Sequence, residues 1–99
     1  MLEFNLSGNL GKHPRVVGDM VRSTICCNTP INGVPATEPV WVDLEAPAIE
    51  RLGERLLELY KGDGVLVRGI MRVNYYQHGG KEKQGWIMAI NMLNVLFKI

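Results

Sequence analysis

The segment from Gly64 to Tyr76, GVLVRGIMRVNYY, has two different faces when it is read at the two-residue period of a β-strand. One face is mostly apolar and consists of Val65, Val67, Gly69, Met71, Val73 and Tyr75. The other face consists of Leu66, Arg68, Ile70, Arg72, Asn74 and Tyr76. Because guanidinium groups suit phosphates and aromatic rings suit bases, the second face favours contact with single-stranded nucleic acid.

The size and composition of the chain indicate one small globular domain. It has 99 residues, of which 46% are hydrophobic, and we expect a single domain over residues 1–99. The longest apolar run, around Trp86 to Ile90, is far too short to span a membrane, and the N-terminus lacks the pattern of a signal peptide. We therefore expect a cytoplasmic protein without a membrane partner.

The net charge of +1 is unevenly distributed along the chain. Residues 43–63 hold six acidic and three basic side chains, whereas the rest of the chain holds eight basic and four acidic ones. The basic excess therefore lies on the predicted strands and the loops between them, as in a nucleic-acid-binding surface. Many domains can be divided into acidic and basic parts in this way. The uneven charge supports nucleic-acid binding only together with the strand alternation over 64–76.

Clusters of Gly, Pro and Asn divide the chain into short segments. The stretch 28–39 holds three of the five prolines, which predicts a loop or an extended hairpin connection. Residues 78–85 predict a charged, flexible hairpin. The last strand is apolar on both faces, which predicts cover by the core on one side and by the helix or a second subunit on the other. Strands are predicted over Leu2–Leu10, Met20–Cys27, Val40–Leu44, Gly64–Tyr76 and Trp86–Leu96.

A helical period replaces the strand period after Pro47, which suits the first turn of a helix. It lasts until Gly62, which suits the position just past the helix end. Tyr60, near that end, is expected to lie in the core. The predicted core-facing stripe consists of Ile49, Leu52, Leu56 and Leu59.

Three strands, one helix and two strands follow one another in this order. We therefore predict an all-β fold with one helix, a five-stranded Greek-key OB barrel whose helix lies between strands three and four. An SH3-like barrel or a small open sheet with one helix has a similar order of elements. The position of the helix and the long strand leading into a basic hairpin favour the OB barrel.

Two motifs resemble those of bacterial single-stranded DNA-binding proteins. The run from Leu6 to Val16, LSGNLGKHPRV, is similar to that family's I-G-N-L-G-x-D-P-E-V, and the run from Val67 to Tyr76 is similar to its V-x-G-x-L-R-x-R-x-W. The segments 21–27 and 48–62 resemble the strand and the helix between these motifs. The resemblance implies an OB fold, assembly as a dimer or tetramer, and binding of single-stranded DNA without sequence readout, in replication, recombination or repair.

The resemblance also implies which residues contact the DNA. Tyr76 and Trp41 fall at or near positions where the family has stacking tryptophans. Arg72 falls on a strand arginine, and Asn74 replaces a second one. We expect Lys12, the hairpin lysines and Arg68 to assist. The predicted single-stranded DNA-binding residues are Lys12, Arg22, Thr24, Trp41, Arg68, Arg72, Asn74, Tyr76, Lys81 and Lys83.

The sequence also departs from the family pattern. Asp43 lies two residues after Trp41, on the same strand face, where a carboxylate repels phosphate. The chain ends at Ile99 without the acidic tail by which cellular family members recruit partners, and it also resembles the tailless primosomal replication protein N. An adaptor that binds a replication protein through the barrel is therefore the alternative function.

Several of these residues also have a purely structural interpretation. Trp41 and Trp86 can stack on bases or pack in the core or a subunit interface. Arg68 can lie at an interface rather than on the DNA. The lysines Lys81 and Lys83 can simply solvate the hairpin.

The sequence gives no support for catalysis or for a cofactor. It has no Gly-rich phosphate loop, no Ser or Cys beside a plausible base and no paired carboxylates on one pocket wall, so we do not expect an enzyme. His13 and His78 stand apart from other ligand types, so we expect no metal site. The adjacent cysteines Cys26 and Cys27 point to opposite faces of a strand and are expected to be reduced.

Overall fold

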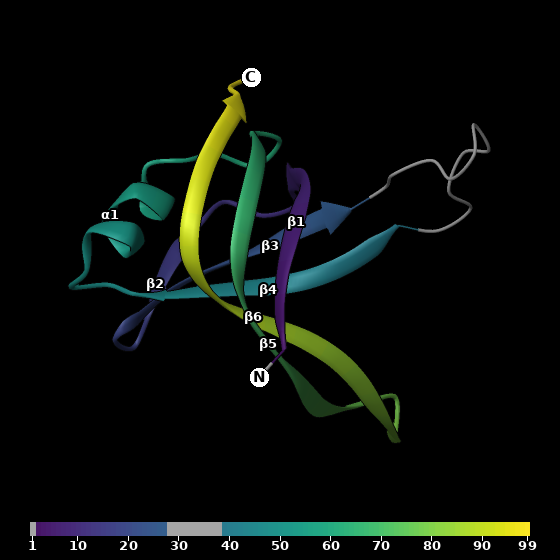
Figure 1. Cartoon of the computed structure of the whole chain (residues 1–99). Helices are drawn as coiled ribbons and strands as arrows, with labels where there is room; N and C mark the ends of the chain where they lie inside the picture. Colours follow the sequence, from purple (N-terminus) through teal and green to yellow (C-terminus); the bar gives the residue numbers. More distant parts are fainter. Residues whose placement is uncertain (1, 28–38) are drawn as a thin grey trace, which may run out of the picture.

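The computed structural model describes residues 2–27 and 39–99. The connection predicted over 28–39 therefore lies almost wholly outside the described residues. The elements, in chain order, are β1 (Glu3–Leu10), β2 (Arg15–Val17), β3 (Met20–Cys27), β4 (Val40–Pro47), α1 (Arg51–Leu57), β5 (Gly64–His78) and β6 (Lys81–Phe97). Figure 1 shows how these elements are arranged.

Five of the strands close into a barrel. The hydrogen-bonded order is β1-β5-β6-β4-β3-β2, in which β4 and β6 run parallel. The far end of β1 also pairs with β3, through Asn9 and Leu10, and this second pairing closes the barrel. The predicted OB barrel is confirmed, with α1 between its third and fourth long strands. The short β2, which the sequence analysis did not anticipate, pairs with the first residues of β3 through a turn at Gly18.

The two faces of β5 separate as the alternation predicts. Val65 and Val67 are fully buried in the core, and Arg68 and Arg72 on the other side are exposed. Gly69 also faces inward, where a Cβ atom would collide with the backbone carbonyl of Ala89 on β6. The strand therefore closes the core with one side and presents its polar side outward.

Helix α1 is shorter than the sequence predicts, because β4 continues to Pro47 and the helix begins only at Arg51. The expected placement of Ile49 is wrong, since this side chain is 92% exposed. Leu56 and Leu59 do join the core, and Leu52 packs against it. The expected burial of Tyr60 is also wrong, since its ring is exposed and lies edge-on to the His13 ring. Within the described residues, no helix is long and apolar enough to cross a membrane.

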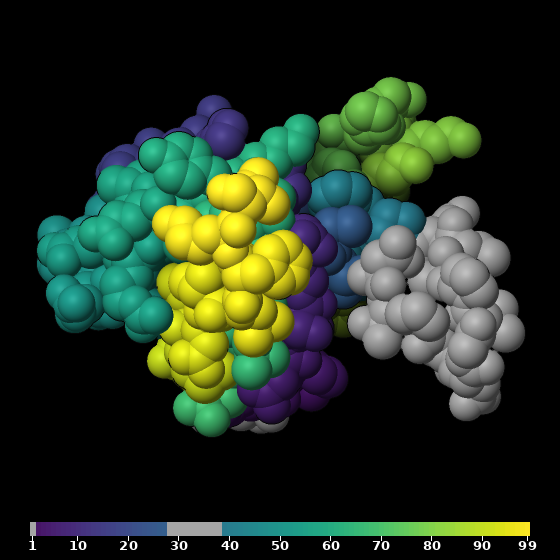
Figure 2. All heavy atoms as spheres, turned by 90° about the horizontal axis from the view of Figure 1, so that it is seen from above, coloured from purple at the N-terminus to yellow at the C-terminus, as the bar shows by residue number. Residues whose placement is uncertain are grey.

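The β5–β6 hairpin extends beyond the barrel, as Figure 1 shows, and its light-green atoms project from the body in Figure 2. The expectation of a flexible segment over 78–85 is wrong in part, because β6 already begins at Lys81. Gly79 and Gly80 have φ angles of +62° and +77°, which two-residue turns between twisted antiparallel strands require. The hairpin is therefore a regular two-stranded ribbon up to its tip.

Candidate nucleic-acid interface

The strand register brings most of the predicted binding residues to one side of the barrel. Across β3 and β4, Arg22 is paired with Glu45 and Thr24 with Asp43. Ile87 on β6 is paired with Asp43 on one side and with Arg72 on the other. Directly paired residues point to the same side of a sheet, so these side chains share one surface. We call this surface the candidate face; it holds Arg22, Thr24, Trp41, Asp43, Glu45, Arg72, Asn74 and Tyr76.

Glu45 lies at the centre of the candidate face and links two of the predicted arginines. Glu45 forms an ion pair with each of them: its Oε1 lies 2.8 Å from Arg72 Nη1, and its Oε2 lies 3.7 Å from Arg22 Nη2. The Glu45 side chain is only 6% exposed, whereas those of Arg72 and Arg22 are 56% and 51% exposed. The arginines therefore cover the carboxylate, while about half of each arginine side chain stays exposed to solvent.

A cavity of about 200 Å³ opens beside this cluster. Thr24 lies in its wall and donates its hydroxyl proton to Asp43 Oδ1 at 3.1 Å. Thr24 is therefore buried and engaged with a carboxylate rather than free to bind a phosphate. Basic, acidic and amide groups all line the cavity, among them Lys12, Arg15, Arg22, Asp43, Glu45 and Asn74.

Lys12 reaches the rim of this cavity from the loop between β1 and β2. Three hydrogen bonds hold the loop. Gly11 donates its backbone N–H to the Thr24 carbonyl at 2.7 Å, Ser23 Oγ donates to the Lys12 carbonyl at 2.9 Å, and His13 Nδ1 accepts the Lys61 backbone N–H at 3.1 Å. The backbone of this loop is thus fixed while the Lys12 side chain stays exposed.

Two aromatic rings are open to solvent on the candidate face. Trp41 is 53% exposed, and its ring lies over Gly11, where a Cβ atom would collide with it. Tyr76 is 47% exposed and lies over Gly85, whose Cβ position is 3.2 Å from the ring. Each ring therefore rests on a glycine and keeps part of its surface available for stacking.

The other two aromatic residues of the hairpin lie on its opposite side. Trp86 is paired with Val73, and Tyr75 with Gln84, whereas Tyr76 is paired with Lys83. The side of the hairpin that carries Tyr76 thus also carries Lys81 and Lys83. Trp86 and Tyr75 are exposed on the far side, away from the candidate face.

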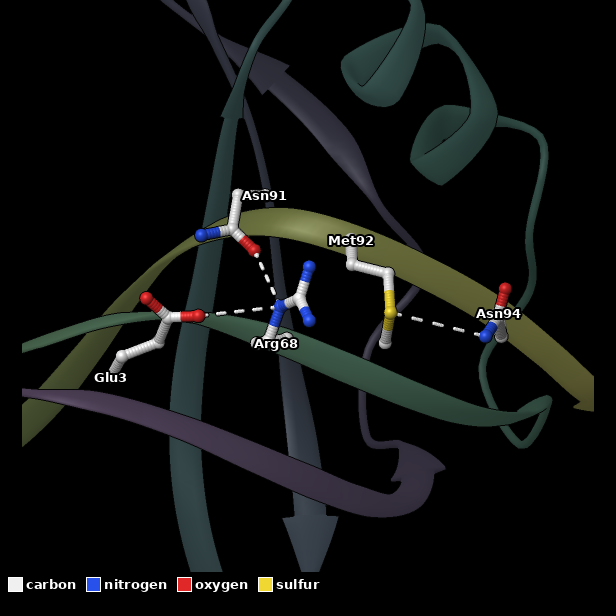
Figure 3. Close-up of polar contacts among 5 residues, drawn as sticks. All are labelled: Glu3, Arg68, Asn91, Met92 and Asn94. Atoms are coloured by element: carbon white, nitrogen blue, oxygen red, sulfur yellow. Dashed lines mark hydrogen bonds and ion pairs between the residues drawn. The ribbon is translucent and has the colours of Figure 1, made fainter.

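Arg68 lies apart from the rest of the predicted residues. Its Nε is 3.3 Å from Glu3 Oε1 on β1 and 3.3 Å from Asn91 Oδ1 on β6, as the close-up in Figure 3 shows. It is on the outward side of β5, four residues before Arg72, where β1 and β6 flank the strand. Arg68 is therefore committed to contacts between strands of the barrel.

Glu45 is the residue of this surface that the sequence analysis missed. A signal for it existed, because Glu45 follows Trp41 and Asp43 at the two-residue period and must share their side. Its two arginine contacts depend on the register of strands far apart in sequence. In the described part of the chain, no group of three His, Cys, Asp or Glu side chains is arranged to hold a metal ion.

Comparison with known proteins supports the fold. No family model matches the sequence, and no curated protein matches it. Among solved structures, a small single-stranded DNA-binding protein from Streptomyces coelicolor superposes with a TM-score of 0.81 and 16% identity, covering 95% of this chain and 93% of that one.

The chain has the fold of single-stranded DNA-binding proteins. A second similar structure is Rim1, a mitochondrial single-stranded DNA-binding protein of S. cerevisiae, with a TM-score of 0.74, 12% identity and coverage of 98% of this chain and 96% of that one. Both similarities extend over nearly the whole of both chains. They establish the OB architecture from β1 to β6, independently of the sequence motifs.

Proposed function

We propose that this protein binds single-stranded DNA without sequence readout, in replication, recombination or repair. The observation that carries the proposal is the candidate face itself. Arg22 and Arg72 come from strands on opposite sides of Glu45, and the exposed rings of Trp41 and Tyr76 lie on the same side of the sheet. A single strand has regularly spaced phosphates and unpaired bases. It therefore binds a row of cations, which contact the phosphates, beside aromatic rings, which stack on the bases.

In this proposal the guanidiniums of Arg22 and Arg72 bind phosphates, and Trp41 and Tyr76 stack on bases. Lys12, Lys81 and Lys83 add exposed positive charge at the loop and the hairpin. Asn74, in the cavity wall, supplies an amide for a sugar, base or phosphate oxygen. Thr24 and Arg68 are not assigned direct DNA contacts in this proposal, because Thr24 is hydrogen-bonded to Asp43 and Arg68 is paired with Glu3.

A fluorescence titration tests the proposal. Oligo-dT is expected to quench tryptophan emission, because Trp41 is the exposed tryptophan of the candidate face. A duplex of equal length is expected to compete poorly, and log affinity is expected to fall with log salt by about 0.7 for each phosphate neutralised. Absence of both quenching and retention of single strands at low salt would show that the proposal is wrong.

Two substitutions test the assignment of the face separately from the function. Trp41→Ala and Tyr76→Ala are each expected to weaken binding, by about 1 to 3 kcal/mol per stacked base. If oligo-dT binds but neither substitution changes the affinity, the DNA lies on another surface. Oligo-U in the same titration compares RNA with DNA.

We further propose that the protein forms a homo-oligomer, a dimer or a tetramer. Support comes from an apolar surface on the inward side of the sheet where it extends past the barrel. Trp86 is paired with Val73 and Met71 with Met88. Met71 also donates its backbone N–H to the Leu2 carbonyl at 2.8 Å, which extends the β1–β5 pairing to Leu2. The exposed side chains there include Leu2, Phe4, Tyr75 and Trp86.

Sedimentation tests the oligomer, with a monomer at micromolar concentration as the contrary result. The same surface favours the second candidate function, an adaptor that docks a replication protein. A monomer that fails to bind oligo-dT would favour this adaptor function over DNA binding. An oligomer that binds oligo-dT would indicate that the apolar surface is the contact between two copies of the chain.

A further inference from the structure

We propose that Glu45 is a positioning residue that holds the guanidiniums of Arg22 and Arg72 ready for phosphate. The inference rests on the proposed binding of single-stranded DNA and extends it to a residue that touches no DNA. Glu45 is buried under both arginines and uses one carboxylate oxygen for each of them. A single side chain thus fixes two cations that come from different strands.

The position of Glu45 in the sheet makes this possible. In the strand order β5-β6-β4-β3, Arg72 reaches over β6 to Glu45, and Arg22 reaches it from the neighbouring β3. Strands β5 and β3 are three strand spacings apart, about 14 Å. Without a shared partner, two long side chains this far apart would each sample many rotamers. The carboxylate draws both guanidiniums toward the middle of the candidate face.

The remaining donors of both arginines stay available. A guanidinium carries five N–H donors, and a carboxylate can take only some of them. Both arginine side chains are about half exposed, so contact with Glu45 leaves neither of them enclosed. Side chains that are fixed before the ligand arrives lose less freedom on binding, so prior fixation increases affinity.

A purely stabilising role explains this carboxylate less well. Buried ion pairs contribute little net stability compared with apolar residues of the same size, because both charges must be desolvated. A negative charge on a phosphate-binding surface also opposes the ligand. Positioning accounts for a glutamate at this place despite both costs, and it predicts an effect with the opposite sign to simple electrostatics.

The test is Glu45→Gln, measured by oligo-dT titration. The substitution raises the net charge by one, so electrostatics alone predicts tighter binding. Positioning predicts binding about tenfold weaker, the loss expected for one charge-assisted hydrogen bond, with a shallower salt dependence. The matched control is Glu82→Gln, which makes the same chemical change on the side of the hairpin away from the candidate face, where Glu82 is paired with Gln77 and forms no ion pair among the described residues. This control is expected to bind as tightly as the wild type or more tightly.

A second substitution, measured first in the wild-type background, gives a result that does not depend on how well Glu45→Gln folds. Arg72→Lys preserves the charge but replaces the planar fork with a point charge, so positioning predicts weaker binding in the wild-type background. In the Glu45→Gln background the same change is expected to have little further effect. A strictly additive double-mutant cycle would contradict the proposal.

The outcomes separate the two hypotheses. If wild-type protein does not bind oligo-dT, the proposed function and this inference both fail. If the wild type binds and Glu45→Gln binds equally well or more tightly, only the inference fails. The inference also fails if Glu82→Gln weakens binding as much as Glu45→Gln, or if Arg72→Lys leaves the affinity unchanged.

Discussion

The candidate face and the β5–β6 hairpin carry the same kinds of side chain, but only the face holds its cations in place. Arg22 and Arg72 meet at a buried carboxylate, and the loop that carries Lys12 is tied down by three hydrogen bonds. On the hairpin, Lys81 and Lys83 are exposed and have no ion-pair partner among residues 2–27 and 39–99.

We therefore expect the candidate face and the hairpin to contribute to DNA binding in different ways. Fixed guanidiniums determine where phosphates sit, because their directions are set before binding. Mobile lysines on an extended ribbon attract the strand over a distance and follow it, which affects association more than the final geometry. The comparison predicts that equal changes of charge in the two regions have unequal effects.

The largest expected effect is that of removing both arginines. Arg22→Ala with Arg72→Ala is expected to weaken oligo-dT binding by about 2 to 3 kcal/mol, or about 30- to 160-fold. It is also expected to lower the free energy of unfolding by about 1 to 3 kcal/mol, because Glu45 is left buried without a cation. Titration and chemical denaturation measure the two effects.

The matched control removes the same charge from the hairpin. Lys81→Ala with Lys83→Ala is expected to weaken binding by about 1 kcal/mol or less, about fivefold, and to leave the free energy of unfolding unchanged. If the two double variants bind equally weakly and are equally stable, charge alone explains the binding and the distinction between fixed and mobile cations is wrong.

The two sides of the hairpin provide an intermediate effect. Tyr76→Ala removes a ring on the side of Lys83 and is expected to weaken binding by about 1 to 3 kcal/mol. Tyr75→Ala removes a neighbouring, more exposed ring from the opposite side and is expected to leave the affinity unchanged. Equal losses in a parallel titration would mean that the strand contacts both sides of the hairpin.

Strand periodicity explains why much of this surface could be predicted. A two-residue period fixes the side to which a residue points, so Arg72, Asn74 and Tyr76 were correctly placed together on the outward side of β5. The register between strands is not encoded in the period. The Glu45 contacts depend on the pairing of β3 with β4 and of β4 with β6, and no local pattern contains these pairings.

The wrong predictions for Ile49 and Tyr60, near α1, have a different cause. At the boundaries of an element the sequence does not show where the strand period ends and the helical period begins or stops. The pairing of β4 with β3 extends to Pro47, so strand structure persists where the sequence predicts the first helical turn. Ile49 then falls in the connection and is exposed. Tyr60 lies beyond the end of the helix, where the helical period no longer decides burial.

The smallest expected effect concerns the end of the barrel opposite to the projecting hairpin. Asp63 is buried; its Oδ2 accepts the Tyr60 backbone N–H at 2.9 Å and its Oδ1 accepts the Ile99 backbone N–H at 3.1 Å. The Tyr60 N–H, then the Ile99 N–H and the charge of Lys98, lower the pKa of Asp63 below its ordinary value, although burial opposes the shift. The ionised carboxylate therefore ties the end of the chain to the segment that follows α1.

A lowered pKa in the folded state means that this stabilisation is fully present above the ordinary carboxyl pKa of about 4 and is lost as the pH falls through the folded-state pKa. Asp63→Asn is expected to lower the Tm by several degrees at pH 7, and the difference from the wild type is expected to shrink below pH 4. His78→Gln, at the hairpin tip, is expected to leave the Tm unchanged over the same range, because the ribbon beyond the barrel contributes little to the core. If the difference in Tm between Asp63→Asn and the wild type were the same at every pH, the negative charge of Asp63 would not be the source of the stabilisation.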